Sequence, residues 1–360
     1  MTQDIINRYD YIINNENIAA IVMRQQLKPV EGDTAVIFPP TYAEIGYNID
    51  KFGQGGGEIT NVCTIDSVGS QANRMEPIFK NPPLCELVPR ITIEIRKPPT
   101  KDQEQGELIE TIDMLDAGHR VADAVVRFSS GGDEIQAAFQ EVKKGNAVSL
   151  AKLDPTSLVF GCWDSRGTSV KIPRIIRSQI TAYNVHQLKR SAQFIPATER
   201  YAECFEKLSD NERKRFADVG MAHVPSIGSP GGVLVDSNSR VLKDMVLSLS
   251  ALRSLHAENF DATTTLRRYI FGLSLIAATA PQDPLLRMGC ELTADPQKPA
   301  KWEQVNCDGT RSPIAFSYED TLAFAVAAGA DFGIGESKNF IFDRKKAREA
   351  LKKKGKSEEE

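Results

Sequence analysis

The first half of the chain contains segments in which apolar and polar residues alternate, the pattern of half-buried strands. "RITIEIRK" (90–97) is the clearest, because an isoleucine stands at every second position of its centre. "DTAVIFPPTYA" (33–43) predicts a strand that stops at two prolines, which cannot continue a ladder of backbone hydrogen bonds. "SLVFGCW" (157–163) and "VKIPRIIRSQITAYNV" (170–185) predict two more strands joined by the turn "DSRG", and Gly161 indicates a bulge or the close approach of another backbone.

Apolar residues at helical spacing predict helices elsewhere. In "DEIQAAFQEVKKG" (133–145) they form one stripe, and the final glycine is typical of a helix end. Helices are also expected over 1–30, the beginning of 110–130 (with a strand at 125–128), 197–208, 209–219, 237–257, 261–280 and 318–328. Segments 223–239 and 291–313 are expected to be loops or hairpins, and the charged tail 343–360, which has no apolar face, to be frayed or disordered. The pattern is that of an α+β protein.

The segment "TIDSVGSQANRMEPIF" (64–79) is too polar for a core helix and too regular for a loop. As a helix it places Met75 and Phe79 on one face, and Gln71 and Arg74 on another. The amide and guanidinium groups carry several donors in fixed directions, which suits a ligand rich in oxygen atoms. The same residues equally fit a helix start capped by Asp66 or Ser67 with a polar outer face.

Composition excludes several classes of protein. Hydrophobic residues make up 41% and charged residues 26% of the 360 positions, which is ordinary for a globular chain. The most apolar run, 269–280, is too short to span a membrane, and the polar N-terminus is not that of a secretory signal. Six scattered cysteines without a CxxC pair predict reduced thiols and no structural zinc. We therefore expect a cytoplasmic protein with one domain over 1–342, no metal, no cofactor and no membrane.

No motif in the sequence makes a convincing active site. The four histidines (119, 186, 223 and 256) lie far apart, and neither GxSxG nor a P-loop lysine motif is present. The glycine-rich stretches "FGQGGGEIT" (52–60) and "GSPGG" (228–232) lack the strand and helix context of a nucleotide loop. Asp113 and Asp116 fit a solvated face. The expectation is that the protein is not an enzyme.

Positive charge is concentrated, although the net charge is −4. The stretch "RGTSVKIPRIIR" carries Arg166, Lys171, Arg174 and Arg177 without an acid, and "HQLKR" (186–190) follows. Cations along an extended segment can line a groove for phosphates, with affinity that depends on salt and not on base sequence. Trp163 or Tyr183 would stack on a base. Trp163 equally fits the core, and Arg177 fits an ion pair.

Three blocks together resemble a known family: "IDSVGSQANRMEPIF", "GHRVADAVVRFSS" and "LDPTSLVFGCWDSRGTSVKIPRIIRSQITAYNV". They are similar to the backbone subunit of type I-G (formerly I-U) CRISPR Cascade complexes, in the RAMP superfamily. The resemblance runs from about Pro29 to Val185 and more weakly to about Phe332. It implies a modified RRM-like (ferredoxin-like) palm with helical and hairpin insertions that form finger and thumb features.

The resemblance also implies a function: copies of the chain stack head to tail along a guide RNA (crRNA), and the guide bases pair with target DNA. The expected partners are crRNA, target DNA through the guide, other copies of the chain and other Cascade subunits. The residues expected to contact RNA are Ser70, Gln71, Asn73, Arg74, Arg120, Arg127, Trp163, Arg166, Lys171, Arg174 and Arg177. The aromatic motif of RRM proteins is not evident, so contact with the RNA backbone is favoured over stacking on the sheet. Segments 98–107 and 223–239 are thumb candidates.

Two other functions are compatible with the sequence. An endoribonuclease of the same superfamily would use His119, His186 or His223 as a general acid or base to process the guide precursor. A metabolic enzyme would use the glycine-rich stretches to hold a phosphorylated small molecule, and it would purify free of RNA.

Overall fold

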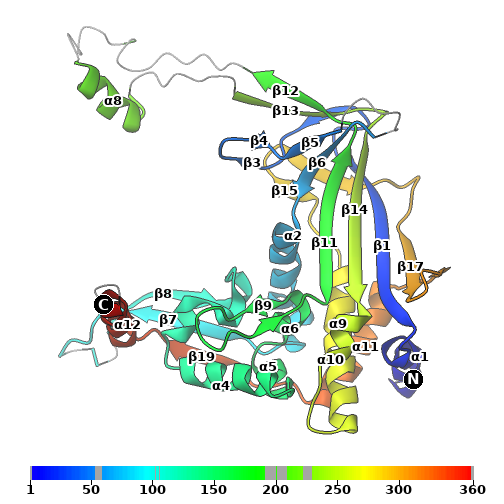
Figure 1. The fold of residues 1–360 in the computed structure, drawn as a ribbon, viewed down its shortest axis with the longest axis vertical. Helices are drawn as coiled ribbons and strands as arrows, with labels where there is room; N and C mark the ends of the chain where they lie inside the picture. The colour runs from blue at the N-terminus through cyan, green and yellow to red at the C-terminus, as the bar shows by residue number, and fades with distance from the viewer. Residues whose placement is uncertain are drawn as a thin grey trace.

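The computed structural model describes residues 2–52, 59–101, 103–104, 106–190, 200, 209–221 and 229–357. Its centre is a curled antiparallel sheet in the order β15-β16-β1-β14-β11-β6-β5, in which β17 also pairs with β1 and β18 (Figure 1). The strands are β1 (Ile18–Pro29), β5 (Ile49–Lys51), β6 (Asn61–Asp66), β11 (Ile176–Tyr183), β14 (Arg240–Ser248), β15 (Leu285–Arg287), β16 (Cys290–Ala294), β17 (Lys301–Asn306) and β18 (Arg311–Pro313). The two central strands, β1 and β14, pair over eight residues.

The two faces of the sheet differ in polarity because side chains alternate along each strand. Ile21, Met23 and Leu27 of β1 are buried on one face, whereas Arg24 points to the other face and is exposed. Helices pack around one end of the sheet: α1 (Thr2–Asn14), α9 (Leu249–Arg253), α10 (Phe260–Thr279) and α11 (Tyr318–Phe332). A methyl group added at Gly272 of α10 would lie 3.0 Å from the backbone of Ala325, so glycine permits α10 and α11 to pack closely.

A side lobe projects from the end of the sheet where the helices pack (Figure 1). Its sheet has the order β19-β7-β8, with β19 parallel to β7. The strands of the lobe are β7 (Ile91–Arg96), β8 (Leu108–Asp113), β9 (Cys162–Trp163), β10 (Lys171–Ile172) and β19 (Lys338–Ile341). Its helices are α3 (Ala124–Arg127), α4 (Gly132–Lys143), α5 (Val148–Leu153), α6 (Pro155–Phe160) and α12 (Arg344–Ser357), with 3-10 turns η2 (Leu84–Glu86), η3 (Met114–Asp116) and η4 (Arg120–Ala122).

An arm projects from the opposite end of the sheet, in the same direction as the side lobe (Figure 1). It consists of β12 (His186–Arg190) and β13 (Ser229–Val235), which pair antiparallel, and β13 also pairs with β2 (Ala35–Ile37). The described part of the arm also includes α8 (Asp210–Asp218). The hairpin β3 (Thr41–Tyr42) and β4 (Gly46–Tyr47) lies at its base.

Between lobe and arm, α2 (Val68–Met75) packs against β11 and continues into the 3-10 turn η1 (Glu76–Lys80) (Figure 1). Ser67 caps α2, since its hydroxyl accepts from the backbone N–H of Ser70 at 3.3 Å. Met75 and Phe79 are fully buried, which confirms the predicted apolar face of this segment.

Several other sequence predictions are confirmed. Strands occupy 35–37, 91–96 and 176–183, and helices occupy 132–143, 210–218, 260–279 and 318–332. Segment 291–313 forms hairpins as expected, and 98–107 is the tip of the β7–β8 hairpin in its described residues. The helix expected at 197–208 and the loop at 53–58 lie outside the described residues.

Six predictions of secondary structure are wrong. The helices expected at 18–30 and 237–248 are β1 and β14, and the helix expected from 110 begins as the end of strand β8. The strand expected at 157–160 is part of helix α6, and the strand expected at 125–128 is largely helix α3. The tail was expected to be frayed or disordered, but residues 344–357 form α12. In α6, Pro155 at the first helical position after Asp154 is a start signal that the apolar run concealed.

Candidate nucleic-acid interface

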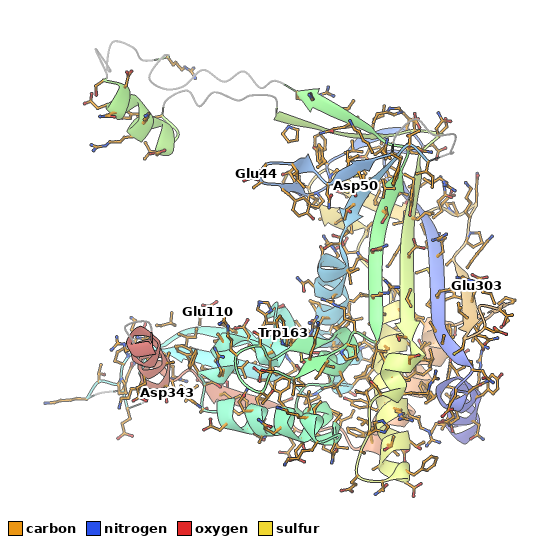
Figure 2. All side chains as sticks on the ribbon, viewed as in Figure 1. Glu44, Asp50, Glu110, Trp163, Glu303 and Asp343 are labelled. Carbon is orange, nitrogen blue, oxygen red and sulfur yellow. The ribbon has the colours of Figure 1, made fainter. Side chains whose placement is uncertain are left out.

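The side lobe carries a groove of about 650 Å³ between the β9–β10 hairpin and the segment from Gly118 to Arg127. We call it the Trp163 groove (Figure 2). Its functional side chains are His119, Arg127, Trp163, Arg166, Lys171 and Arg174. None of the described residues that line the groove is acidic. Such a concentration of uncompensated positive charge beside an exposed aromatic ring suits a polyanion that has free bases.

The turn of the β9–β10 hairpin is built on the buried side chain of Asp164. Its Oδ2 accepts from the backbone N–H of Thr168 at 2.6 Å, from the Thr168 hydroxyl at 2.8 Å and from Nε2 of Gln136 at 3.1 Å. A methyl group at Gly167 would lie 2.2 Å from Oε1 of Gln136, so the turn packs tightly on α4. This framework fixes the turn that carries the exposed side chain of Arg166.

Trp163 and Lys171 are direct partners across the hairpin. The Lys171 ammonium lies 5.8 Å from the centre of the indole ring, within the range of a cation–π contact. The Trp163 side chain is 60% exposed. The alternative that this tryptophan belongs to the core is therefore wrong, and the ring is accessible to a stacking base.

Gly161 brings the chain close to Arg174. It has a φ of +75°, and a methyl group there would lie 2.9 Å from the backbone nitrogen of Arg174. The close approach predicted at this glycine is confirmed. Partial burial, followed by the proximity of Arg120, lowers the pKa of the Arg174 guanidinium from its usual value. An anion placed beside Arg174 would relieve this unfavourable environment.

Arg120 lies beneath the groove and is 3% exposed. Its guanidinium forms an ion pair with Glu76 through contacts of 2.9 and 2.8 Å, and it donates to the carbonyl of Gly161 at 2.9 Å. Its backbone adopts a φ of +51°, which is uncommon for a residue other than glycine. Arg120 therefore supports the wall of the groove, and it cannot reach RNA without breaking these bonds.

Glu76 belongs to a buried acidic cluster beneath the groove. The Thr156 hydroxyl lies 2.7 Å from Oε1 of Glu76 and 2.6 Å from Oδ1 of Asp154. The hydroxyl has one proton and can donate to only one of the two carboxyl groups; when Glu76 is protonated, it can itself donate to the hydroxyl. Burial raises the pKa of Glu76 to about 7 against the opposing effect of Arg120. Because its pKa is raised to this value, the Glu76 carboxylate can accept a proton near neutral pH.

Arg127 occupies the opposite side of the groove. Its guanidinium lies 4.9 Å from the ring centre of Phe128, and its Nε is buried without a hydrogen-bond partner. A buried donor without a partner is costly, and an oxygen atom of a bound ligand would satisfy it. Arg127 lines the groove, and its contact with RNA stays a prediction.

Arg177 is not part of the Trp163 groove. It lies on the exposed face of the central sheet, in a separate hollow of about 690 Å³ with Gln179 and Arg24. Arg24 there is paired with Asp244 at 2.6 Å, and Glu303 also lines the hollow, so this surface has mixed charge. The basic run that looks continuous in the sequence is divided between two surfaces.

The polar side chains of α2 are only partly accessible. Gln71 is 1% exposed; it donates to Asp66 at 2.6 Å and accepts from the Ser178 hydroxyl at 2.8 Å. Arg74 donates to Asp66 at 3.0 Å and to the carbonyl oxygens of the β15 segment. Gln71 and Arg74 thus tie α2 to the sheet, and the expectation of direct RNA contact is not supported for them. Ser70 is half-buried and Asn73 is exposed, but neither lines the Trp163 groove.

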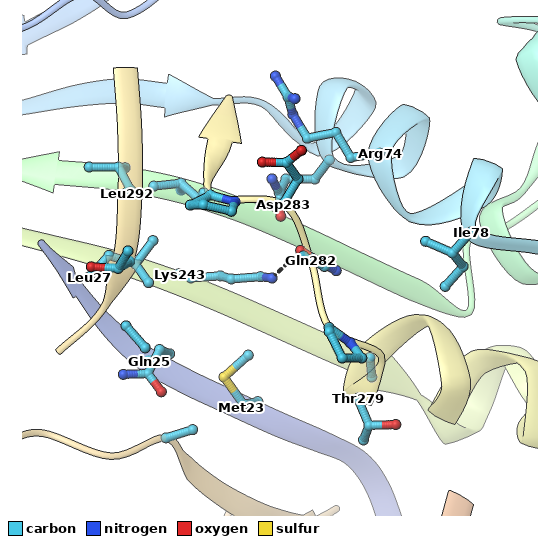
Figure 3. Close-up of a pocket in the computed structure, with 18 of the residues that line it drawn as sticks. Met23, Gln25, Leu27, Arg74, Ile78, Lys243, Thr279, Gln282, Asp283 and Leu292 are labelled. Carbon is cyan, nitrogen blue, oxygen red and sulfur yellow. Dashed lines mark hydrogen bonds between the residues drawn. The ribbon is translucent and has the colours of Figure 1, made fainter. Parts of the chain in front are cut away.

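Gln71 and Arg74 also line a cavity of about 800 Å³ on the buried face of the sheet (Figure 3). Lys243 of β14 points into it and donates a hydrogen bond to Oε1 of Gln282. Burial lowers the pKa of the Lys243 ammonium to about 8. The sequence analysis missed Lys243, because it assigned this segment to a helix. It also missed Asp164, for which the turn "DSRG" was the available signal.

Part of the chain matches the model of a known protein family. Residues 21–187 match the model of a protein family described as CRISPR-associated protein GSU0053. The match indicates a CRISPR-associated protein. The matched segment extends from β1 into β12 and contains every residue of the Trp163 groove. No curated protein matches the chain significantly.

Two features are absent from the residues that the structure describes. No helix among them combines the length and apolar character needed to cross a bilayer. No group of three or more histidine, cysteine, aspartate or glutamate side chains among them is arranged to hold a metal ion.

Replacing Trp163 with alanine is expected to weaken RNA binding by about 1–3 kcal/mol, the usual value of one base–aromatic stack. The Trp163→Phe variant should retain most of the affinity, because it keeps a ring. Since the indole is exposed, neither change should alter the free energy of unfolding by more than about 0.5 kcal/mol. Fluorescence anisotropy with a labelled RNA and urea unfolding measure the two quantities. Equal affinity of the parent and Trp163→Ala would contradict the assignment.

Proposed function

We propose that this chain is the guide-RNA-binding backbone subunit of a type I-G CRISPR Cascade complex, and that it is not an enzyme. The observation that carries the proposal is the Trp163 groove, which combines Arg127, Arg166, Lys171 and Arg174 with an exposed indole and no acidic lining. A site that binds single-stranded nucleic acid independently of sequence requires cations for the ribose–phosphate chain and a ring on which a base can stack. The match to a CRISPR-associated family over the same residues supports it.

The strand order supports a RAMP-type, ferredoxin-like palm. Neighbouring strands run in the order β17-β1-β14-β11, which is fourth, first, third and second in the order of the chain. In a ferredoxin-like palm, the helices between β1 and β11 would form the crossover that connects those two strands, and α10 would form the crossover between β14 and β17. β6 then extends the sheet beyond β11, and the side lobe is an insertion in the first crossover.

The arm is the proposed thumb. It extends away from the sheet, and the described residues of β12 include the exposed cations Lys189 and Arg190 (Figure 1). A segment that projects from one copy can reach the next copy along the guide, and repetition of that contact gives an open filament. This arrangement would leave part of the guide free to pair with target DNA.

The proposal predicts that the chain, co-expressed with a guide array, purifies as an RNA-containing assembly with several copies per guide. Native mass spectrometry measures both the RNA and the number of copies. A guide of twice the length should bind about twice as many copies, because stacking continues along the strand. A discrete oligomer without RNA would contradict the proposal and favour a metabolic enzyme.

An endoribonuclease remains the second candidate because of one observation: His119 is exposed and lines the Trp163 groove. An imidazole beside bound RNA can act as a general acid or base. Cleavage of the guide precursor by the parent, with loss of cleavage but unchanged RNA affinity in His119→Ala, would establish this activity. His256, which lies 3.4 Å from Arg267 outside the groove, provides the matched His256→Ala control.

A further inference from the structure

The C-terminal helix α12 is fixed to the side lobe. The strand before it, β19, pairs with β7, and the backbone N–H of Asp343 donates to the carbonyl of Phe128 at 2.6 Å. The Asp343 carboxylate then caps the helix by accepting from the backbone N–H groups of Lys345 at 2.8 Å and Lys346 at 3.0 Å. The position of the first turn of α12 relative to the lobe is therefore defined.

A positively charged hollow lies where α12 meets the β7–β8 hairpin. Its volume is about 560 Å³, and the cations that line it are Arg96, Lys97, Arg344, Lys345 and Arg348. We call it the α12 patch. Among the described residues that line the α12 patch, the acidic one is Asp343, and its carboxylate caps the helix. In the sequence, residues 344–356 contain eight lysines and arginines and one glutamate, and three glutamates follow at 358–360.

Three of the five cations in the α12 patch have no ion-pair partner among the described side chains. Arg96 pairs with Glu94 at 2.6 Å, and Lys97 pairs with Glu107 at 2.6 Å. Arg344, Lys345 and Arg348 have no such carboxylate. Because they stand at positions i, i+1 and i+4 of the helix, they share one side of it. Uncompensated cations on one side of a fixed helix are suited to a row of phosphates.

The α12 patch lies on the same lobe as the Trp163 groove but differs from it in chemistry. Arg127 lines the groove, and Ser130, three residues later, lines the patch. Figure 2 shows Trp163 and Asp343 on the same lobe, with Asp343 nearer to its far end. The groove offers an exposed ring for a free base, whereas the ring in the patch, Phe342, is half-buried. A surface with charge and without a stacking ring fits a duplex, whose bases are already stacked inside.

We propose that the α12 patch binds the phosphate backbone of duplex DNA beside the guide held in the Trp163 groove. The inference rests on the proposed function for its biological setting, but the site itself depends only on the residues of the patch. Its residues on α12 lie outside the segment that matches the CRISPR-associated family, which ends at residue 187, whereas Arg96 and Lys97 lie within that segment. Each copy of the chain would thus contact two nucleic acids, with the guide and the duplex on neighbouring parts of one lobe.

The test compares two triple variants of the full chain that remove the same charge. The patch variant is Arg344→Gln, Lys345→Gln and Arg348→Gln. The control variant is Arg8→Gln, Lys28→Gln and Lys144→Gln, which removes two exposed cations and the half-buried Lys28; they pair with Asp320, Glu141 and Asp33, respectively. A fluorescent random-sequence DNA duplex and a guide RNA are the two probes, and anisotropy is measured at several salt concentrations with and without bound guide.

The patch variant is expected to lose about 10- to 100-fold in affinity for the duplex, with a salt dependence shallower by about two to three counterions. Its guide-RNA affinity should change by less than about twofold, and the control variant should match the parent within about threefold for both probes. Arg344→Lys with Arg348→Lys, which keeps the charge, should retain duplex binding. Equal loss in the two triple variants, unchanged duplex binding in the patch variant or equal loss of guide RNA would each overturn the inference. Failure of the parent to bind guide RNA would instead contradict the proposed function, because duplex binding is measured separately without guide.

Discussion

Replacing Arg166, Lys171 and Arg174 together with glutamine should weaken guide-RNA binding by about 30- to 100-fold near physiological salt, with a log–log salt slope shallower by about two. These side chains converge on one groove without an acidic lining, so each can neutralise a phosphate. They are exposed, and the Asp164 framework of the hairpin remains intact, so the fold should be retained. Anisotropy titrations with a guide oligonucleotide at several salt concentrations measure both quantities.

The control for this experiment is Arg8→Gln, Lys28→Gln and Lys144→Gln, which lowers the net charge equally at ion pairs that do not line the groove. If the control loses as much affinity as the groove variant, the effect belongs to overall charge and not to the site. Arg177→Gln provides a second comparison, because the structure places Arg177 on the open face of the sheet. If Arg177→Gln lost more affinity for guide RNA than the groove variant, the guide would be assigned to the open face of the sheet instead.

The second large expected effect is on the free energy of unfolding, and it differs between the two partners of the buried ion pair, Glu76 and Arg120. Glu76→Ala should lower the free energy of unfolding by about 3–5 kcal/mol, because it leaves a buried guanidinium without a counter-charge. Arginine cannot release its proton to avoid this cost. Arg120→Met should cost less in slightly acidic solution, because Glu76 can take up a proton and become neutral. Urea unfolding of both variants beside the parent measures the difference.

The pH dependence of Arg120→Met follows from the raised pKa of Glu76. In the parent, burial raises this pKa to about 7 although Arg120 opposes the shift, so it should rise further without the arginine. The folded variant then binds a proton that the unfolded chain releases, and its stability should fall as the pH increases from about 6 to about 8. Equal costs of Glu76→Ala and Arg120→Met, both independent of pH, would contradict the proposed proton uptake.

The candidate site could be predicted where its residues are close in the sequence. Trp163, Arg166, Lys171 and Arg174 lie within one hairpin and its exit, so local sequence brings them together. Arg127 was predicted from the family resemblance, and the structure places it on the opposite wall. Arg120 could not be distinguished from these by residue type, because only the buried partner Glu76, 44 residues away, turns it inward.

Strand alternation explains why the basic run is divided. Ile175 and Ile176 are both buried, and β11 begins at Ile176, so Arg177 faces the open side of the sheet while Arg174 stays beside the hairpin. Gln71 was expected on a ligand-binding face because it is polar. In the structure its amide is hydrogen-bonded to Asp66 and to Ser178 of β11 instead. The bond between Gln71 and Ser178 spans 107 positions, and no local pattern indicates it.

The sequence by itself determined the local features of this protein: the strand at 91–96, the amphipathic helix at 132–143, the helix that follows Ser67 and the concentration of cations after Trp163. Only the tertiary structure decided that β1 and β14 are strands, although alanine, methionine, glutamine, leucine and lysine in them favour a helix. Each of these two strands has hydrogen-bonded neighbours on both edges and buries one face. Those non-local interactions outweigh helix propensities that amount to less than about 1 kcal/mol per residue.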